Sequence, residues 1–254
     1  EDMLSGDVEM WTALLKFHLP AAIDGRSVRL VNAGRKAFNA TRIAQLIYQE
    51  IAPFEPDVIV YYEAWNEQYT PASPWVGSLL YGRSMLVTYF VEKFILLPAE
   101  RASFTVPQDY SEQAFKKAIG SARAAGADFA YVTQASQIPR FYSETDTMDG
   151  GAIERRLDAL ARDPHYRWNA YEISALNQRL TVLNTMTWAR HEGAPVINIM
   201  PELFALTAQA HQSYFDDLGH TNCTGNQWLA RTVGANLARY FSHKNAETQT
   251  ASNP

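Results

Sequence analysis

The sequence predicts an α/β fold, a three-layer sandwich in which helices cover both faces of a mainly parallel central sheet. Short runs of β-branched and aromatic residues alternate with longer segments of helical periodicity, and each run is followed by a turn or loop. Such an alternation favours parallel strands joined by helices, with an active site at the carboxyl ends of the strands. The chain has 254 residues, of which 47% are hydrophobic and 19% are charged, a balance typical of a compact globular protein.

Four apolar runs are short enough and rich enough in β-branched residues to be buried strands. They span residues 27–33, 57–63, 128–134 and 194–200. Six other segments repeat apolar residues at helical spacing. They span residues 8–19, 41–52, 78–96, 111–125, 171–191 and 225–241. Predicted strands and helices therefore alternate along nearly the whole chain.

Two segments interrupt this alternation, residues 68–74 and residues 141–164. Both are rich in polar, Gly or Pro residues, so we expect them to be loops that flank the binding cleft. We expect one domain over residues 1–241, because no linker and no internal repeat interrupts the pattern. Residues 242–254 are polar and lack periodic apolar positions, which predicts a flexible, frayed tail.

Composition argues against several kinds of partner, binding site and segment. The net charge of −5 comes without a basic stripe, so a nucleic-acid partner is not expected. Cys223 is the only cysteine, which excludes an internal disulfide and a cysteine-ligated zinc site. No uninterrupted apolar run reaches about 18 residues, so no transmembrane segment is expected. We predict no metal, since the histidines other than His220 lack partners at metal-ligand spacing, and we expect no other cofactor.

The most specific chemical signal is the stretch Tyr-Phe-Asp-Asp-Leu-Gly-His at residues 214–220. Asp217 stands three residues before His220 on a predicted loop, a spacing that can place the carboxylate against the imidazole. A carboxylate in that position fixes the tautomer of the ring and stabilises the imidazolium formed when the ring takes a proton from a nucleophile. The stretch follows the last predicted strand and leads through Gly225 into the last predicted helix.

This arrangement resembles the last sequence block of the SGNH (GDSL-type) hydrolases, and two earlier stretches resemble other blocks of that family in the same order. Residues 31–34 (Val-Asn-Ala-Gly) are similar to the block whose glycine N–H donates to the oxyanion hole, and Gly34 is the match. Residues 58–67 are similar to the block whose asparagine side chain is another donor, and Asn66 is the match. Ala64 replaces the usual Gly of this block, and Glu67 replaces the usual Asp.

The resemblance implies a flavodoxin-like domain and the activity of a serine esterase without cofactors. In that role His220 relays a proton, Asp217 orients His220, and Gly34 with Asn66 binds the negative charge on the former carbonyl oxygen. A preorganised donor of this kind contributes about 2.7–4 kcal/mol to transition-state stabilisation in other enzymes. The expected substrate is a small-molecule or carbohydrate ester whose acyl and alcohol parts the sequence does not specify.

The nucleophilic serine is the part of the family pattern that these residues match least. The family places it in a first block, after a first strand, and we expect that block to lie upstream of Glu1. Ser5 is the only candidate within the chain, but no apolar strand precedes it, and Ser5-Gly6-Asp7 also fits a helix-capping turn. Because the first strand is central in a flavodoxin-like sheet, we expect an upstream segment or companion fragment to add a strand beside residues 28–32.

Two alternatives belong to other functional classes. A non-catalytic SGNH-like domain that binds a ligand or carbohydrate would explain the missing serine block and the changes at Ala64 and Glu67. The presence of both Asp217 and His220 argues against it, because a binding domain has no need of the pair. A flavin or nucleotide binder with a flavodoxin-like fold is disfavoured, since no Gly-rich phosphate loop such as G-x-G-x-x-G is present.

Overall fold

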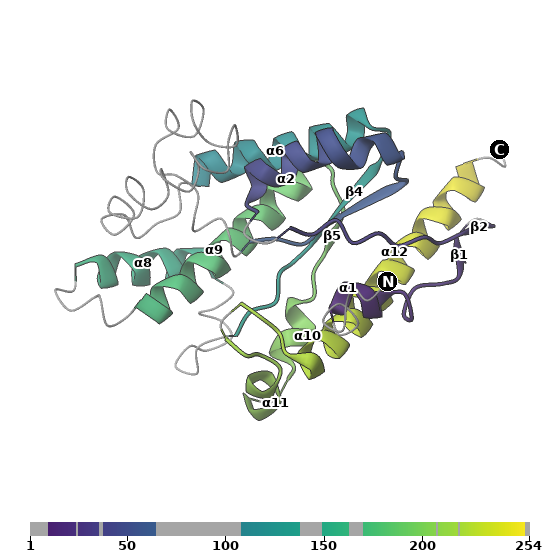
Figure 1. Cartoon of the computed structure of the whole chain (residues 1–254). Helices are drawn as coiled ribbons and strands as arrows, with labels where there is room; N and C mark the ends of the chain where they lie inside the picture. Colours follow the sequence, from purple (N-terminus) through teal and green to yellow (C-terminus); the bar gives the residue numbers. More distant parts are fainter. Residues whose placement is uncertain are drawn as a thin grey trace, which may run out of the picture. The chain divides into compact units, whose positions relative to one another are not determined.

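The computed structural model shows a mixed α/β protein with a three-stranded parallel sheet and many helices, which confirms the predicted α/β class (Figure 1). It describes residues 10–23, 25–35, 38–64, 108–137, 149–162, 170–206, 208–217 and 219–251. The chain divides into two compact units. Unit 1 comprises Glu1–Gly34, Ala135–Gln137 and Ile197–Pro254, and unit 2 comprises Arg35–Gln134 and Ile138–Val196.

The sheet contains three of the four predicted strands. Strands β3 (Val58–Tyr61), β4 (Asp128–Val132) and β5 (Val196–Ile197) lie in the order β3-β4-β5. The register of the parallel pair β3 and β4 places Tyr61 opposite Tyr131. The backbone N–H of Tyr131 donates to the carbonyl of Pro195 at 2.9 Å, just before β5. The predicted strands at 57–63, 128–134 and 194–200 are therefore confirmed, each with shorter bounds.

Aromatic side chains form much of the core of unit 2. Phe115 of α6 (Gln108–Ala124) packs edge-on against Tyr61, Phe129 and Tyr131, with ring centroids 5.2–5.7 Å apart. The same buried cluster includes residues of α2 (Ala40–Leu46) and α9 (Ala170–His191). Edge-on aromatic pairs add to the stabilisation from buried area. This packing fixes the carboxyl ends of β3 and β4.

The predicted helices of unit 2 are confirmed where the structure describes them. α2 begins after Asn39, whose side chain accepts a hydrogen bond from the N–H of Arg42, and it continues into a π-helical turn (Ile47–Ile51) and a 3-10 turn (Ala52–Phe54). α6 and α9 correspond closely to the predictions at 111–125 and 171–191. The predicted loop 68–74 and helix 78–96 lie outside the described residues.

The prediction of a loop over 141–164 is wrong for its second half, which contains α8 (Gly150–Ala161). The side chain of Asp149 accepts a hydrogen bond from the N–H of Gly151 at 2.9 Å and caps the helix. Ile153, Leu157 and Leu160 lie on one face of α8 and pack in a buried cluster with Leu176 of α9. Burial of this apolar face outweighs the weak helix propensity of the glycines at the start.

Most of the described helices of unit 1 come from the last part of the chain. A short helix α1 (Trp11–Leu15) replaces the longer predicted helix 8–19 within the described residues. The other elements are a two-stranded antiparallel hairpin and three helices. They are β1 (Ala22–Ile23), β2 (Arg26–Ser27), α10 (Met200–Phe204), α11 (Ala208–Ser213) and α12 (Cys223–Ala251). α12 confirms the predicted helix 225–241 and continues to Ala251, within the segment 242–254 expected to be a flexible tail.

The prediction of a buried strand over 27–33 is wrong. Only Ser27 belongs to a strand, β2, and that strand pairs with β1 rather than with the parallel sheet. Leu30 is 38% exposed and Val31 is 69% exposed, so neither side chain is buried in a core. Among the described residues, no strand pairs with residues 28–32.

Candidate functional site

The predicted acid–base residues lie on a closed loop between α11 and α12 in unit 1. Phe215 and Thr221 form an antiparallel bridge, and the N–H of Asp216 donates to the carbonyl of His220 at 2.9 Å. These bonds bring the two arms of the loop together below its tip. Asp217 and His220 lie at that tip, within the part of the loop that the bridge encloses.

The carboxylate of Asp217 accepts hydrogen bonds from three donors. The Nδ1 atom of His220 lies 2.9 Å from Oδ1 and 2.8 Å from Oδ2 of Asp217. The backbone N–H groups of Gly219 and His220 donate to Oδ1 at 2.8 and 2.9 Å. Because an ionised carboxylate only accepts, this contact puts a ring proton on Nδ1 and leaves Nε2 of the neutral ring able to accept a proton.

Electrostatics keep Asp217 in its ionised form. Partial burial tends to raise the pKa of Asp217, but the hydrogen bonds from the His220 ring and from the two backbone N–H groups outweigh it. The pKa of Asp217 therefore lies below its ordinary value. A carboxylate that is ionised at neutral pH can stabilise an imidazolium formed during catalysis.

Both side chains of the pair remain open to solvent. The side chain of His220 is 73% exposed and that of Asp217 is 59% exposed. A side-chain contact this exposed contributes about 0–1 kcal/mol to stability even when both groups are charged, because solvent screens it. Ordering of the loop, rather than strong stabilisation of the fold, is thus the main consequence of the contact, and the ring remains accessible to a reacting group.

The other predicted site residues are not joined to this pair in the described residues. The N–H of Gly34, the expected oxyanion donor, donates to Oδ1 of Asn32 at 3.0 Å and is exposed. Asn66 and the serine candidate Ser5 lie outside the described residues. Ala64, which precedes the predicted oxyanion turn, is buried and lies three residues after the end of β3. The structure therefore brings Asp217 and His220 together and leaves the oxyanion donors as predictions.

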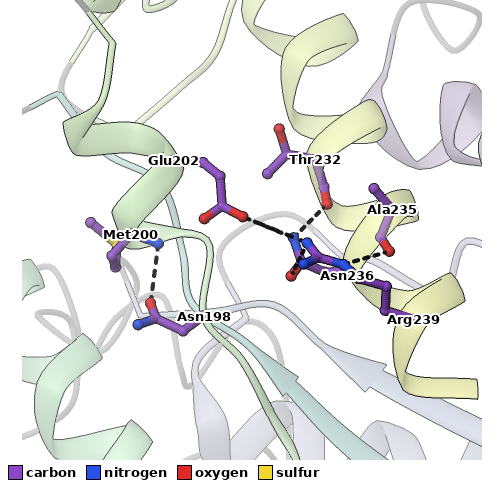
Figure 2. A network of polar contacts seen from close by, with 7 residues as sticks. All are labelled: Asn198, Met200, Glu202, Thr232, Ala235, Asn236 and Arg239. Carbon is purple, nitrogen blue, oxygen red and sulfur yellow. Dashed lines mark hydrogen bonds and ion pairs between the residues drawn. The ribbon is translucent and has the colours of Figure 1, made fainter. Parts of the chain in front are cut away.

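A second polar network in unit 1 joins α10 to α12 (Figure 2). Oε1 of Glu202 accepts a hydrogen bond from the side-chain amide of Asn236 at 3.2 Å, and Arg239 donates to Oδ1 of Asn236 at 3.0 Å. Asn198 accepts from the N–H of Met200 at 3.1 Å and so holds the start of α10. These side chains bond to helix backbone and to one another, which is the pattern of a structural tie between helices.

A third group of polar residues is buried in unit 2, and sequence reasoning did not single it out. Glu63, Tyr131 and Arg179 are each less than a tenth exposed. Burial lowers the pKa of Arg179 to about 10, while nearby Tyr131 acts to raise it. Burial, and next the nearby Glu63 carboxylate, raise the pKa of Tyr131 above its ordinary value. The signal in the sequence was an arginine inside the apolar pattern of α9.

The described part of the chain holds no group of three or more His, Cys, Asp or Glu residues that could bind a metal ion. Among the helices in that part, none is both long and apolar enough to span a membrane. Comparisons with protein-family models, with curated proteins and with solved structures gave no match to this chain. The functional assignment therefore depends on the geometry of the site.

Proposed function

We propose that this protein is a serine esterase of the SGNH type with a flavodoxin-like α/β fold. The observation that carries the proposal is the hydrogen bond between Asp217 and Nδ1 of His220, made on a loop that holds the carboxylate with two backbone N–H groups. This arrangement has the geometry expected of the acid–base half of a Ser-His-Asp triad, and it supports the proposal. The parallel pairing of β3 with β4 is compatible with a flavodoxin-like sheet.

In the proposed reaction a serine hydroxyl attacks the carbonyl carbon of an ester. Nε2 of His220 takes the proton of that hydroxyl, and Asp217 stabilises the resulting imidazolium. His220 then gives the proton to the departing alcohol, and an acyl-enzyme forms. Water activated by the same imidazole cleaves the acyl-enzyme and regenerates the serine. Asn66 and the N–H of Gly34 are the proposed donors to the oxyanion.

The identity of the nucleophile is a separate part of the proposal. Within the described residues, no serine hydroxyl is hydrogen-bonded to His220. A fluorophosphonate reacts covalently with an activated serine and marks it for peptide mapping by mass spectrometry. We expect one serine of the native protein to be labelled at a rate that depends on His220.

One observation favours the alternative of a non-catalytic binding domain. The N–H of Gly34 is already bonded to Asn32, so this donor is not directed at a substrate oxygen in the present conformation. In that alternative Asp217 and His220 would hold a ligand rather than transfer protons. Neither fluorophosphonate labelling nor ester hydrolysis would then be observed.

Hydrolysis of p-nitrophenyl acetate by the native protein and by His220→Ala tests the proposal. Loss of a triad member in other serine hydrolases lowers kcat by about 10⁶-fold, so the variant should fall close to background. His191→Ala is the matched control, because His191 is also exposed and lies 3.6 Å from a carboxylate oxygen of Glu192. Equal loss in both variants, or no labelled serine and no turnover in the folded native protein, contradicts the proposed activity.

A further inference from the structure

Asn222 lies at the junction between the His220 loop and α12, and all four of its polar groups are bonded within unit 1. Its side-chain amide donates to the carbonyl of Ser213 at 2.7 Å, and its backbone N–H donates to the carbonyl of Tyr214 at 3.0 Å. Its side-chain Oδ1 accepts from the N–H of Gly225 at 3.1 Å, and its carbonyl accepts from Asn226 at 2.7 Å.

These bonds join the entry of the loop to its exit. Ser213 is the last residue of α11, and Gly225 and Asn226 lie in the first turn of α12. One half-buried side chain thus both caps α12 and fastens the end of α11 against it. Thr221 adds a bond from its hydroxyl to Oδ1 of Asn226 at 2.7 Å.

Gly225 makes this closure possible because of its close approach to the other arm of the loop. A Cβ atom at this position would lie 2.0 Å from the carbonyl oxygen of Tyr214 and 2.9 Å from Cβ of Thr221. Only glycine fits there without displacing backbone. The arms at Tyr214 and Thr221 therefore lie directly against the start of α12, and Asp217 and His220 lie on the short span between them.

We infer that Asn222 is the positioning residue of the candidate acid–base pair: it fixes both ends of the 214–222 loop so that His220 keeps its Nδ1 contact with Asp217. The role in catalysis rests on the proposed esterase function. Asn222 does not touch the reacting atoms. It acts by restricting the two ends of the loop, while the exposed side chains of Asp217 and His220 bond to each other and to the backbone of the tip.

Two substitutions separate the capping role of Asn222 from its role in closing the loop. Asn222→Asp keeps an oxygen that can cap α12 but loses the donor to Ser213, whereas Asn222→Ala loses both. Asn236→Ala is the control, because Asn236 is a half-buried asparagine like Asn222, but its side-chain amide donates to Thr232 and Glu202, which are not loop residues (Figure 2).

The main measurement is the ¹⁵N chemical shift of both ring nitrogens of His220, which reports the tautomer without any assay of activity. We expect the Nδ1–H tautomer in the native protein and in Asn236→Ala, and a mixture of tautomers in both Asn222 variants. In the same variants kcat for p-nitrophenyl acetate should fall by about 100-fold with KM unchanged, as expected for a misplaced catalytic group. A native-like tautomer and kcat in Asn222→Asp would overturn the inference.

A further measurement on the native protein applies even if the Asn222 variants fail to fold. The side-chain amide protons of Asn222 should exchange slowly with solvent if the bond to Ser213 closes the loop, and exchange at the rate of a free amide overturns the inference. The two proposals fail separately. A single Nδ1–H tautomer of His220 that is lost in the Asn222 variants supports the positioning role of Asn222. Native protein that cleaves no ester contradicts only the proposed esterase activity.

Discussion

The carboxylate of Asp217 is bonded to three N–H groups although more than half of its side chain is exposed. Oδ1 accepts both backbone N–H groups and also lies within hydrogen-bond distance of the His220 ring, while Oδ2 contacts the ring alone. This division lets one oxygen order the loop while the other orients the imidazole. Without such backbone bonds, the two exposed side chains would sample many relative orientations, because side-chain entropy opposes holding them in one contact.

The lowered pKa of Asp217 predicts how the loop responds to acid. A carboxyl whose pKa is lower in the folded state stabilises that state above its unfolded pKa, about 3.9, and the stabilisation is lost as pH falls through the folded pKa. The Asp217 carboxyl carbon should therefore titrate by ¹³C NMR at a lower pH in the folded protein than in unfolded protein. Asp217→Asn should remove this part of the pH dependence of unfolding. A folded midpoint at or above the unfolded one contradicts the hydrogen-bonded geometry.

At the scale of elements, the connection between the loop and α12 depends on a glycine. Gly225→Ala would place a methyl group 2.0 Å from the carbonyl oxygen of Tyr214, so backbone must move. We expect the free energy of unfolding to fall by about 1–3 kcal/mol, as in other overpacked sites, and the Asp217–His220 contact to loosen.

Gly120→Ala in α6 is the control for this substitution, because a Cβ atom there meets nothing within 4 Å. It should raise stability by about 0.5–1 kcal/mol, since alanine has the higher helix propensity. Urea denaturation measures both changes, and the ring nitrogens of His220 report the contact. If Gly225→Ala is as stable as the native protein, the close approach is absent in solution.

Individual elements could be predicted from the sequence where one signal was strong. α6, α9 and α12 have long helical periodicity, and β3 and β4 are short β-branched and aromatic runs. α8 was missed because glycines, charges and a proline mark its surroundings as a loop, although Ile153, Leu157 and Leu160 already had helical spacing. The low helix propensity of the glycines favoured a loop, but the helical spacing of the apolar residues was the better guide, because α8 buries those residues.

The candidate site was predictable only in part, for a reason that concerns the whole molecule. The spacing of Asp217 and His220 is local, so their contact could be predicted from four residues of sequence. The bonds of Asn222 that close the loop depend on the position of Ser213 and on the direction of α12, which no local pattern specifies. The segment 27–33 shows the same limit, because a short apolar run forms a strand only when a partner strand is present to bond with.

Two valines test which apolar runs belong to a core of the molecule. Val31 lies in the run wrongly predicted as a buried strand and is 69% exposed, whereas Val132 ends β4 and is 0% exposed. Val31→Ala should change the free energy of unfolding by at most about 0.5 kcal/mol, as is usual for an exposed site. Val132→Ala should lower it by about 2 kcal/mol through lost burial and the cavity left behind. Equal losses in urea denaturation would mean that residues 28–33 are packed in the protein as a strand, which contradicts their exposure in the structure.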